Sequence, residues 1–312
     1  MTVVFGFEVD VAVVMALILG GMAASLFLLA RCMTPRRGPD AKPVWLAADN
    51  PAKRAWEVFM LRYAPFWIAG FAIIVALQLY EGFRELEYMV VCGGLALPIL
   101  LLPFLYPPAA EVARPIAERF SLKANLWMAV YSFIGNYWYT HYFYSVLGAR
   151  YTFPSWRLND VPVPLYFATL FYFCTYHVAS NAAIRRVITG YEHTAWRSMF
   201  LSGLVLSLAY LMAYMETLTI SGFPHYSFAD RDMAYVLGSA FYGIYFVVSF
   251  PMFYCLDERP SERGGSRGEA SLWQAAVSSL GCGMLVLSLL DAVRLAVGVA
   301  LVIPGGGDGG AT

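Results

Sequence analysis

Charged side chains are scarce in this chain. Asp, Glu, Lys and Arg make up 13% of its 312 residues, hydrophobic residues make up 60%, and the mean hydropathy is +0.60. Water-soluble domains carry about 25% charged residues, so this composition excludes that class. The 21 basic and 21 acidic residues cancel, so no net charge attracts nucleic acid or an acidic partner. We predict an integral membrane protein.

The sequence also lacks the patterns typical of metal, disulfide and nucleotide-cofactor sites. Its five cysteines are odd in number, scattered and never in a C-x-x-C pair, so we expect small buried thiols rather than disulfides or zinc. The four histidines form no H-x-x-H, H-x-x-x-H or E-x-x-H spacing. No nucleophile elbow, phosphate loop or dinucleotide fingerprint occurs. We therefore predict a function without a metal or a cofactor.

Long apolar runs are what the sequence does have. A helix needs about 20 apolar residues to cross the hydrocarbon layer, and the chain offers eight such segments joined by short connections. They are 9–30, 58–80, 88–106, 125–147, 164–184, 198–220, 233–255 and 273–303. We predict an all-α, polytopic integral membrane helical bundle with about eight transmembrane helices.

Lys and Arg are distributed unevenly between the two ends of these spans. The loops after spans one, three, five and seven carry 15 of them, and the alternate loops carry 4. Because cytoplasmic loops are enriched in Lys and Arg, we predict that the first set faces the cytoplasm and that both termini lie on the other side. No basic residue precedes the first span, which indicates a retained anchor rather than a cleaved signal.

The fourth span ends in a tyrosine-rich run, NYWYTHYFYSVLGARYTFPSW, at residues 136–156. In a helix, spacings of three and four residues place several of its polar side chains on one face: Tyr137, Thr140, His141 and Tyr144. Asn136 lies beside them. Interhelical hydrogen bonding is the simpler interpretation for Asn136 and Thr140. For His141, interhelical hydrogen bonding and a direct chemical role are both open.

Few ionisable groups occur inside the spans, where each costs several kcal/mol to insert. The helical rise puts His141, Glu216 and Asp291 about 24, 27 and 27 Å from the inner ends of their spans, in one layer near the outer surface. Glu216 has no basic residue within a helical turn, and burial favours the uncharged form of such a carboxyl. Asp291 and Arg294 are three residues apart, and we expect them to form a structural pair.

Two further sets of polar residues are less suited to chemistry. His177 and Asn181 lie four residues apart near the inner end of span five, and we predict structural roles for both. Glu81 begins an acidic connection that also holds Glu85 and Glu87. Water would keep an exposed carboxylate there ionised, and a wetted loop is the simpler interpretation for at least one of the three.

A carboxyl group, an imidazole and many aromatic rings inside an apolar bundle suit proton transfer to a hydrophobic substrate. The faces of Tyr and Trp rings can stabilise a carbocation formed by that transfer. We predict Glu216 as the proton donor, ahead of Glu81. His141 is third, and a neutral imidazole is better suited to orienting the acid or accepting the second proton.

Seven segments carry a family resemblance, in order, from about Trp45 to about Val302. They are WLAADNPAKRAWE from Trp45, LYEGFRELEY from Leu79, KANLW from Lys123, NYWYTHYFYSVLGARYTFPSW from Asn136, YHVASN from Tyr176, AYMETLTIS from Ala213 and YFVVSFPMF from Tyr245. Together they closely resemble the cycloeucalenol cycloisomerase family, the cyclopropyl sterol isomerases of plants.

The resemblance implies an isomerase of the intramolecular lyase type. It would open the 9,19-cyclopropane ring of a cyclopropyl sterol and form an 8(9) double bond, without a redox cofactor or a metal. The expected partners are that sterol and membrane lipid. The expected membrane is the endoplasmic reticulum in a plant, and the inner or plasma membrane in a bacterium. We expect the sterol to contact Asn136, Tyr137, Thr140, Tyr144 and Trp156.

The resemblance also divides the chain. Residues 1–44 would be an N-terminal extension with one extra transmembrane helix and a basic linker, residues 45–303 the membrane-embedded sterol isomerase domain, and residues 304–312 a flexible glycine-rich tail. Two alternatives would use the same residues: a sterol double-bond isomerase, or a non-enzymatic sterol or lipid binding or transport protein. The lack of repeats and interrupted spans counts against transport.

Overall fold

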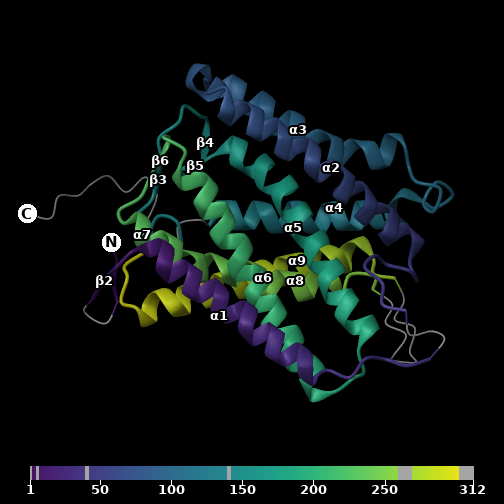
Figure 1. Cartoon of the computed structure of the whole chain (residues 1–312). Coiled ribbons are helices and arrows are strands. Elements are labelled where there is room, and N and C mark those ends of the chain that lie inside the picture. The colour runs from purple at the N-terminus through teal and green to yellow at the C-terminus, as the bar shows by residue number, and fades with distance from the viewer. Residues whose placement is uncertain (1, 5–6, 39–41, 139–141, 259–268, 302–312) are drawn as a thin grey trace, which may run out of the picture.

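The computed structural model describes residues 2–4, 7–38, 42–138, 142–258 and 269–301. In chain order its elements are β1 (Thr2–Val4), β2 (Phe7–Val9), α1 (Val11–Cys32), α2 (Pro51–Ala76), η1 (Leu79–Gly82), α3 (Glu85–Leu105), η2 (Ile116–Glu118), α4 (Phe120–Tyr137), β3 (Arg150–Tyr151), β4 (Arg157–Leu158), β5 (Val161–Pro162), α5 (Val163–Gly190), α6 (Ala195–Ser221), β6 (Tyr226–Ser227), α7 (Arg231–Met233), η4 (Ala234–Gly238), α8 (Ser239–Tyr254) and α9 (Leu272–Ala296). The strands form three short antiparallel pairs, β1 with β2, β3 with β6 and β4 with β5. The described chain is thus a helical bundle, as predicted (Figure 1).

Six helical segments of the described chain are long and apolar enough to cross a membrane. They are α1, α2, α3, α6, the continuous stretch from α7 through α8, and α9. The two other predicted spans correspond to α4 and α5, which are not among the six, so the predicted count of eight is not confirmed. Figure 1 shows where these two helices lie: they run between α2 and α3 on one side and α1, α6, α8 and α9 on the other. A helix surrounded by protein can carry polar side chains that lipid would not tolerate.

Contacts between distant segments define two ends of the bundle. At the end that we call inner, the Arg36 backbone N–H donates to the Gly190 carbonyl, 3.0 Å away, and so joins the chain after α1 to the end of α5. At the opposite end, which we call outer, β3 pairs with β6, and the Tyr80 ring centroid lies 4.6 Å from that of Phe223. The helices therefore alternate in direction as the spans predict.

Two predicted spans run well past the ends of their helices. α4 ends at Tyr137 rather than near residue 147, and α9 ends at Ala296 rather than 303. Gly298, at a φ of 73°, terminates α9, as glycine commonly does in the left-handed conformation. Tyr144 therefore does not lie on the helix that ends at Tyr137, and Thr140 and His141 lie outside the described residues.

Residues 142–153, beyond the end of α4, form a compact aromatic cap instead of a helix. Tyr142, Phe143 and Leu147 are 1–2% exposed, and the Phe143 ring stacks on Tyr151 with 4.4 Å between centroids. Counting Tyr, Trp and Phe as hydrophobic does not say whether their rings face lipid or protein, so the predicted span ran past the end of α4.

Several basic residues predicted to lie in inner loops are instead buried in helices. Lys53 is 0%, Lys123 2%, Arg185 2% and Arg197 4% exposed, and the first three pair with carboxylates. Part of the basic excess at the inner end is thus neutralised within the protein. The topology prediction rests on the exposed remainder, such as Arg37.

Single introduced cysteines test this topology. Arg37→Cys lies at the inner end, and Leu158→Cys lies at the outer end beside Arg157. Native cysteines must first be replaced, because Cys32 and Cys255 are exposed, unlike the buried Cys92, Cys174 and Cys282 and contrary to our expectation. On sealed vesicles, a membrane-impermeant maleimide should label only one of the two variants, and the other only after permeabilisation. Labelling of both from the same side would contradict the predicted topology.

Candidate functional site

Glu216 lies near the outer end of α6 and points between helices. Its Oε2 accepts a hydrogen bond from the Tyr242 hydroxyl of α8 at 3.0 Å. The Tyr176 side chain of α5 also forms a hydrogen bond with the carboxyl group. No Lys or Arg forms an ion pair with Glu216 in the part of the chain that the structure describes. The carboxyl group is therefore half-buried among three helices and held by tyrosine hydroxyls.

More tyrosines surround this carboxyl group. The Tyr142 ring stacks on Tyr242, with 5.5 Å between centroids, and Glu216 interacts electrostatically with Tyr142, Tyr172 and Tyr226. Burial raises the pKa of Tyr142 and of Tyr226. Both therefore stay neutral at physiological pH. We define the outer cluster as Glu216 with Tyr142, Tyr172, Tyr176, Tyr226 and Tyr242.

Sequence reasoning identified Glu216 but missed the tyrosines of the outer cluster. They come from the cap after α4, from α5, from β6 and from α8, which are far apart in the chain. The available signal was the spacing of four residues between Tyr172 and Tyr176, which puts both on one face of α5.

The residues predicted to contact the sterol are spread over several surroundings. Asn136 donates from Nδ2 to Thr169 Oγ1 at 2.8 Å, an interhelical bond between α4 and α5. Tyr137 is half-buried and stacks on Phe133. Tyr144 is 2% exposed and donates to the Asp160 carbonyl at 2.6 Å. Trp156 is 53% exposed.

In the described part of the chain, no hydrogen bond or ring contact joins Tyr137, Tyr144 or Trp156 to Glu216. Their role in sterol binding stays a prediction. Thr140 and His141 belong to the same run but lie outside the described residues.

Glu81, the second candidate for the acid, is exposed in η1 at the outer end. Its neighbours Glu85 and Glu87 begin α3 rather than lying in a loop, and the Glu87 carboxylate accepts from the Arg84 backbone N–H at 2.8 Å. Glu87 is thus a helix cap, and Glu81 is a solvent-exposed carboxyl group.

The polar residues predicted to be structural all have partners. Arg294 pairs with Asp291 at 2.6 Å on α9. His177 is fully buried, with Nε2 2.8 Å from the Ser249 hydroxyl of α8 and Nδ1 2.7 Å from the Phe173 carbonyl. Asn181 lies 3.5 Å from a carboxylate oxygen of Glu57.

A second group of ionisable residues, which we call the inner cluster, joins α2, α5 and the segment after α8. Arg185 pairs with Glu57 at 2.7 Å and with Glu258 at 2.7 Å, and Lys53 pairs with Glu258 at 2.7 Å. Burial alone would raise the pKa of Glu258, but Arg185 and Lys53 hold it below its usual range. The two cations and two carboxylates neutralise one another. The inner cluster therefore holds α2, α5 and the segment after α8 together.

Lys53 and Arg185 were predicted to be charges of inner loops, and their ion pairs were not predicted. The available signal was the four-residue spacing of Lys53 and Glu57 in the first turns of a helix. Glu258 lies more than 70 residues from Arg185 in the chain, and nothing local in the sequence links the two.

Comparison of the sequence with known proteins found a named relative. A cycloeucalenol cycloisomerase from Arabidopsis thaliana is 43% identical over 272 residues, which cover 86% of this chain and 95% of the relative. No protein-family model and no solved structure matches.

Proposed function

The chain belongs to the cycloeucalenol cycloisomerase family, and we propose that it opens the 9,19-cyclopropane ring of a cyclopropyl sterol to give an 8(9)-unsaturated sterol. The protein is an isomerase. The observation that carries this conclusion is the identity to the Arabidopsis relative over nearly the whole of both chains. A sterol double-bond isomerase or a non-enzymatic sterol protein is not favoured by that observation.

The reaction adds one proton to the substrate and removes another from it. The acid gives a proton to carbon 19, and the electron pair of the bond between carbons 9 and 19 becomes the new C–H bond. The cation left at carbon 9 then loses the carbon 8 proton to a base, and that electron pair forms the 8(9) double bond. Substrate and product have the same atoms, so no oxidant or reductant takes part.

We assign the first proton to Glu216. A lone carboxylate removed from water is costly, and in the described chain Glu216 has tyrosine hydroxyls rather than a cation beside it. Such surroundings favour a carboxyl group that keeps its proton until the substrate takes it. The hydrogen bond from Tyr242 also fixes the direction of the carboxyl group, which proton transfer requires.

The tyrosines of the outer cluster are proposed to stabilise the cation. Tyr142, Tyr172 and Tyr226 come from the cap, α5 and β6 and interact electrostatically with Glu216, and we propose that their rings face a sterol that reaches the carboxyl group. Each cation–π contact is worth about 0.5–2 kcal/mol, more when water is excluded. His141 remains a proposed catalytic residue, suited to orienting the acid or to accepting the second proton.

The apolar helices indicate a multi-pass membrane protein, and we propose that the sterol reaches the site from the bilayer. The endoplasmic reticulum in a plant, or the inner or plasma membrane in a bacterium, is the proposed location. Residues 45–303 are the proposed isomerase domain. α1 lies outside it and packs mainly on α6.

Turnover in heavy water tests the proposed reaction. The purified protein should convert a cyclopropyl sterol into a product with one deuterium in the new carbon 19 methyl group and none gained at carbon 8, read by mass spectrometry and NMR. Only an external proton delivered to carbon 19 gives that pattern. A deuterium-free product, or a requirement for added nicotinamide, would contradict the mechanism.

An 8(9)-unsaturated sterol incubated in parallel is the control for double-bond isomerase activity. It should be recovered unchanged while the cyclopropyl sterol is consumed.

A further inference from the structure

Two tyrosine hydroxyls of the outer cluster have no hydrogen-bond partner in the described part of the chain. They belong to Tyr172 of α5 and Tyr226 of β6. In contrast, the Tyr176 and Tyr242 side chains bond Glu216. Tyr172 and Tyr226 are each partly exposed, and neither hydroxyl is among the sealed polar atoms of the described residues. Both hydroxyls are therefore open to a ligand.

Neighbouring rings hold these two tyrosines in place. The centroid of the Tyr172 ring lies 4.5 Å from that of Trp67 on α2 and 5.2 Å from that of Phe171. The centroid of the Tyr226 ring lies 5.2 Å from that of Tyr151 on β3. Packing of this kind restricts the rotamer of each tyrosine, so the position of its hydroxyl is set before a ligand binds.

The two side chains lie near each other and near the proposed acid. Tyr226 interacts electrostatically with Tyr172, and each of them does so with Glu216 and with Cys92 of α3. The hydrogen bonds of the Glu216 carboxyl group in the described chain come from Tyr176 and Tyr242 instead. A polar atom that meets the hydroxyls of Tyr172 and Tyr226 would therefore lie close to the carboxyl group without replacing its bonds.

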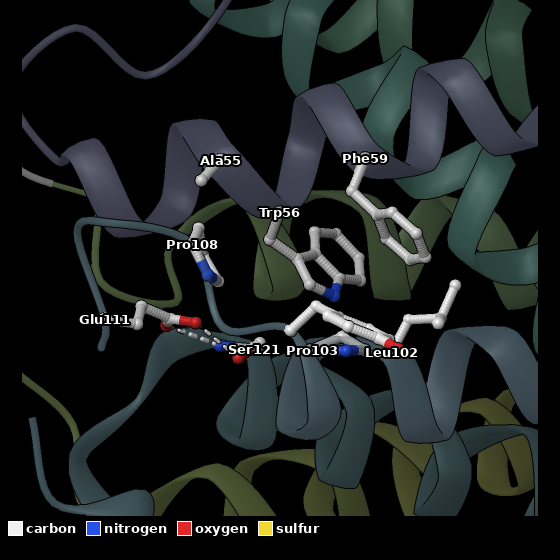
Figure 2. A pocket seen from close by; sticks show the side chains of 9 residues that line it. Ala55, Trp56, Phe59, Leu102, Pro103, Pro108, Glu111 and Ser121 are labelled. Atoms are coloured by element: carbon white, nitrogen blue, oxygen red, sulfur yellow. Dashed lines mark hydrogen bonds between the residues drawn. The ribbon is translucent and has the colours of Figure 1, made fainter.

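A pocket at the inner end of the bundle offers no such pair of hydroxyls. It has a volume of about 320 Å³, and Figure 2 shows the rings of Trp56 and Phe59 extending toward it from α2. Its buried polar side chains, Glu111 and Ser121, are bonded to each other, because the backbone N–H and the hydroxyl of Ser121 both donate to the carboxyl group. The open hydroxyls of Tyr172 and Tyr226 thus distinguish the outer cluster from this pocket.

The polar group of a sterol matches the two open hydroxyls. A hydroxyl donates one hydrogen bond and accepts others, so the 3-hydroxyl can donate to one tyrosine and accept from the other. Carbon 19 is bonded to carbon 10 of ring A, and carbon 3 belongs to the same ring. A sterol with carbon 19 at Glu216 therefore carries its 3-hydroxyl close to that carboxyl group, where Tyr172 and Tyr226 lie.

We propose that the hydroxyls of Tyr172 and Tyr226 bind the 3-hydroxyl of the sterol and so position carbon 19 at the Glu216 carboxyl group. The choice of a sterol rests on the proposed function, whereas the choice of a neutral hydroxyl rests on the two open tyrosines. The outer cluster contains no Lys or Arg to neutralise an anionic headgroup. The rings of both tyrosines keep their proposed role beside the cation, since only their hydroxyls bond the sterol.

Sterol affinity tests this assignment without turnover. The full chain, in phosphatidylcholine nanodiscs, binds a tritiated 8(9)-unsaturated sterol, which is the expected product and is not consumed. The same unlabelled sterol and its 3-deoxy counterpart compete with it, and affinities are expressed against the mole fraction of each sterol in the bilayer. The 3-deoxy sterol should bind at least about fivefold more weakly, the effect of losing two neutral hydrogen bonds. Equal affinities would overturn the proposal.

Tyr172→Phe and Tyr226→Phe keep the ring and remove only the hydroxyl. Each should weaken binding of the 3-hydroxy sterol by about two- to tenfold and should not weaken binding of the 3-deoxy sterol. A merely structural role would weaken both and leave the ratio of the two affinities unchanged. Tyr166→Phe is the matched control on the same helix, because the Tyr166 hydroxyl already donates to the Leu158 carbonyl at 2.9 Å. Its affinity ratio should equal that of the parent.

The result is distinguishable from failure of the proposed function. If the protein converts no cyclopropyl sterol but its sterol binding depends on the 3-hydroxyl, Tyr172 and Tyr226, the proposed function fails and the hydroxyl site stands. If turnover is normal and the affinity ratio is the same in the parent and in both Phe variants, the hydroxyl site fails alone. A protein that neither binds nor converts a sterol overturns both.

Discussion

Replacing Glu216 with glutamine is expected to abolish ring opening while leaving the fold and sterol binding nearly unchanged. Glutamine keeps the shape of the side chain and an oxygen that can accept from Tyr242, 3.0 Å away in the parent, but it has no proton to give. General acid catalysis contributes about 10²–10⁴-fold to rates, so kcat should fall at least about a hundredfold. The measurement is turnover of a cyclopropyl sterol by purified protein, with sterol affinity measured separately.

Glu81→Gln is the matched control, because it makes the same chemical change at an exposed carboxyl group of the outer end. It should turn over at the parent rate. If Glu216→Gln retains more than a small fraction of the activity while Glu81→Gln is inactive, the proton donor is Glu81 and the outer loop belongs to the active site. If both variants are active, neither carboxyl group is the donor.

Replacing Arg185 with methionine is expected to destabilise the protein strongly without touching the outer cluster. Arg185 is 2% exposed and bridges Glu57 and Glu258. Its loss leaves Lys53 alone to neutralise two buried carboxylates. Breaking a buried ion pair by removing one partner costs about 3–5 kcal/mol, which corresponds to a fall in apparent Tm on the order of 10 °C. Thermal unfolding in detergent measures it.

Two variants make the Arg185 result specific. Arg186→Met changes the neighbouring arginine, which lies over the Trp45 ring at 5.4 Å, and should cost at most about 1 kcal/mol. Glu57→Gln combined with Arg185→Met leaves Lys53 balanced by Glu258 and should recover much of the lost stability. An Arg185→Met protein as stable as the parent would show that the ion pairs of the inner cluster do not stabilise the fold.

Features encoded in contiguous residues could be predicted from the sequence. The long apolar runs correspond to helices, with most ends within a few residues, because the length and hydropathy of a run depend only on its own residues. The pair of Asp291 with Arg294 forms because three residues of helix bring the two side chains together wherever the helix lies. Family membership could be predicted for the same reason, because the motifs of the family are long and continuous.

The end of α4 and the burial of Arg185 could not be predicted, because hydropathy does not say what surrounds a residue. Tyr142, Phe143 and Tyr144, beyond the end of α4, are buried under neighbouring protein instead of continuing a lipid-facing helix. The sequence predicts Arg185 in an inner loop, yet it lies inside α5 between two carboxylates. In both cases the partner that decides the outcome comes from a distant part of the chain.

The sequence by itself determined that this is a helical membrane protein of the cyclopropyl sterol isomerase type, and it singled out Glu216 as an unpaired carboxyl group in an apolar helix. Only the tertiary structure decided that Tyr142, Tyr176 and Tyr242 surround that carboxyl group, and that Lys53, Glu57, Arg185 and Glu258 neutralise one another. The physical reason is that hydrogen bonds and ion pairs act over a few ångströms of space, and the packing of α5, α6 and α8 creates that proximity between residues that the chain keeps far apart.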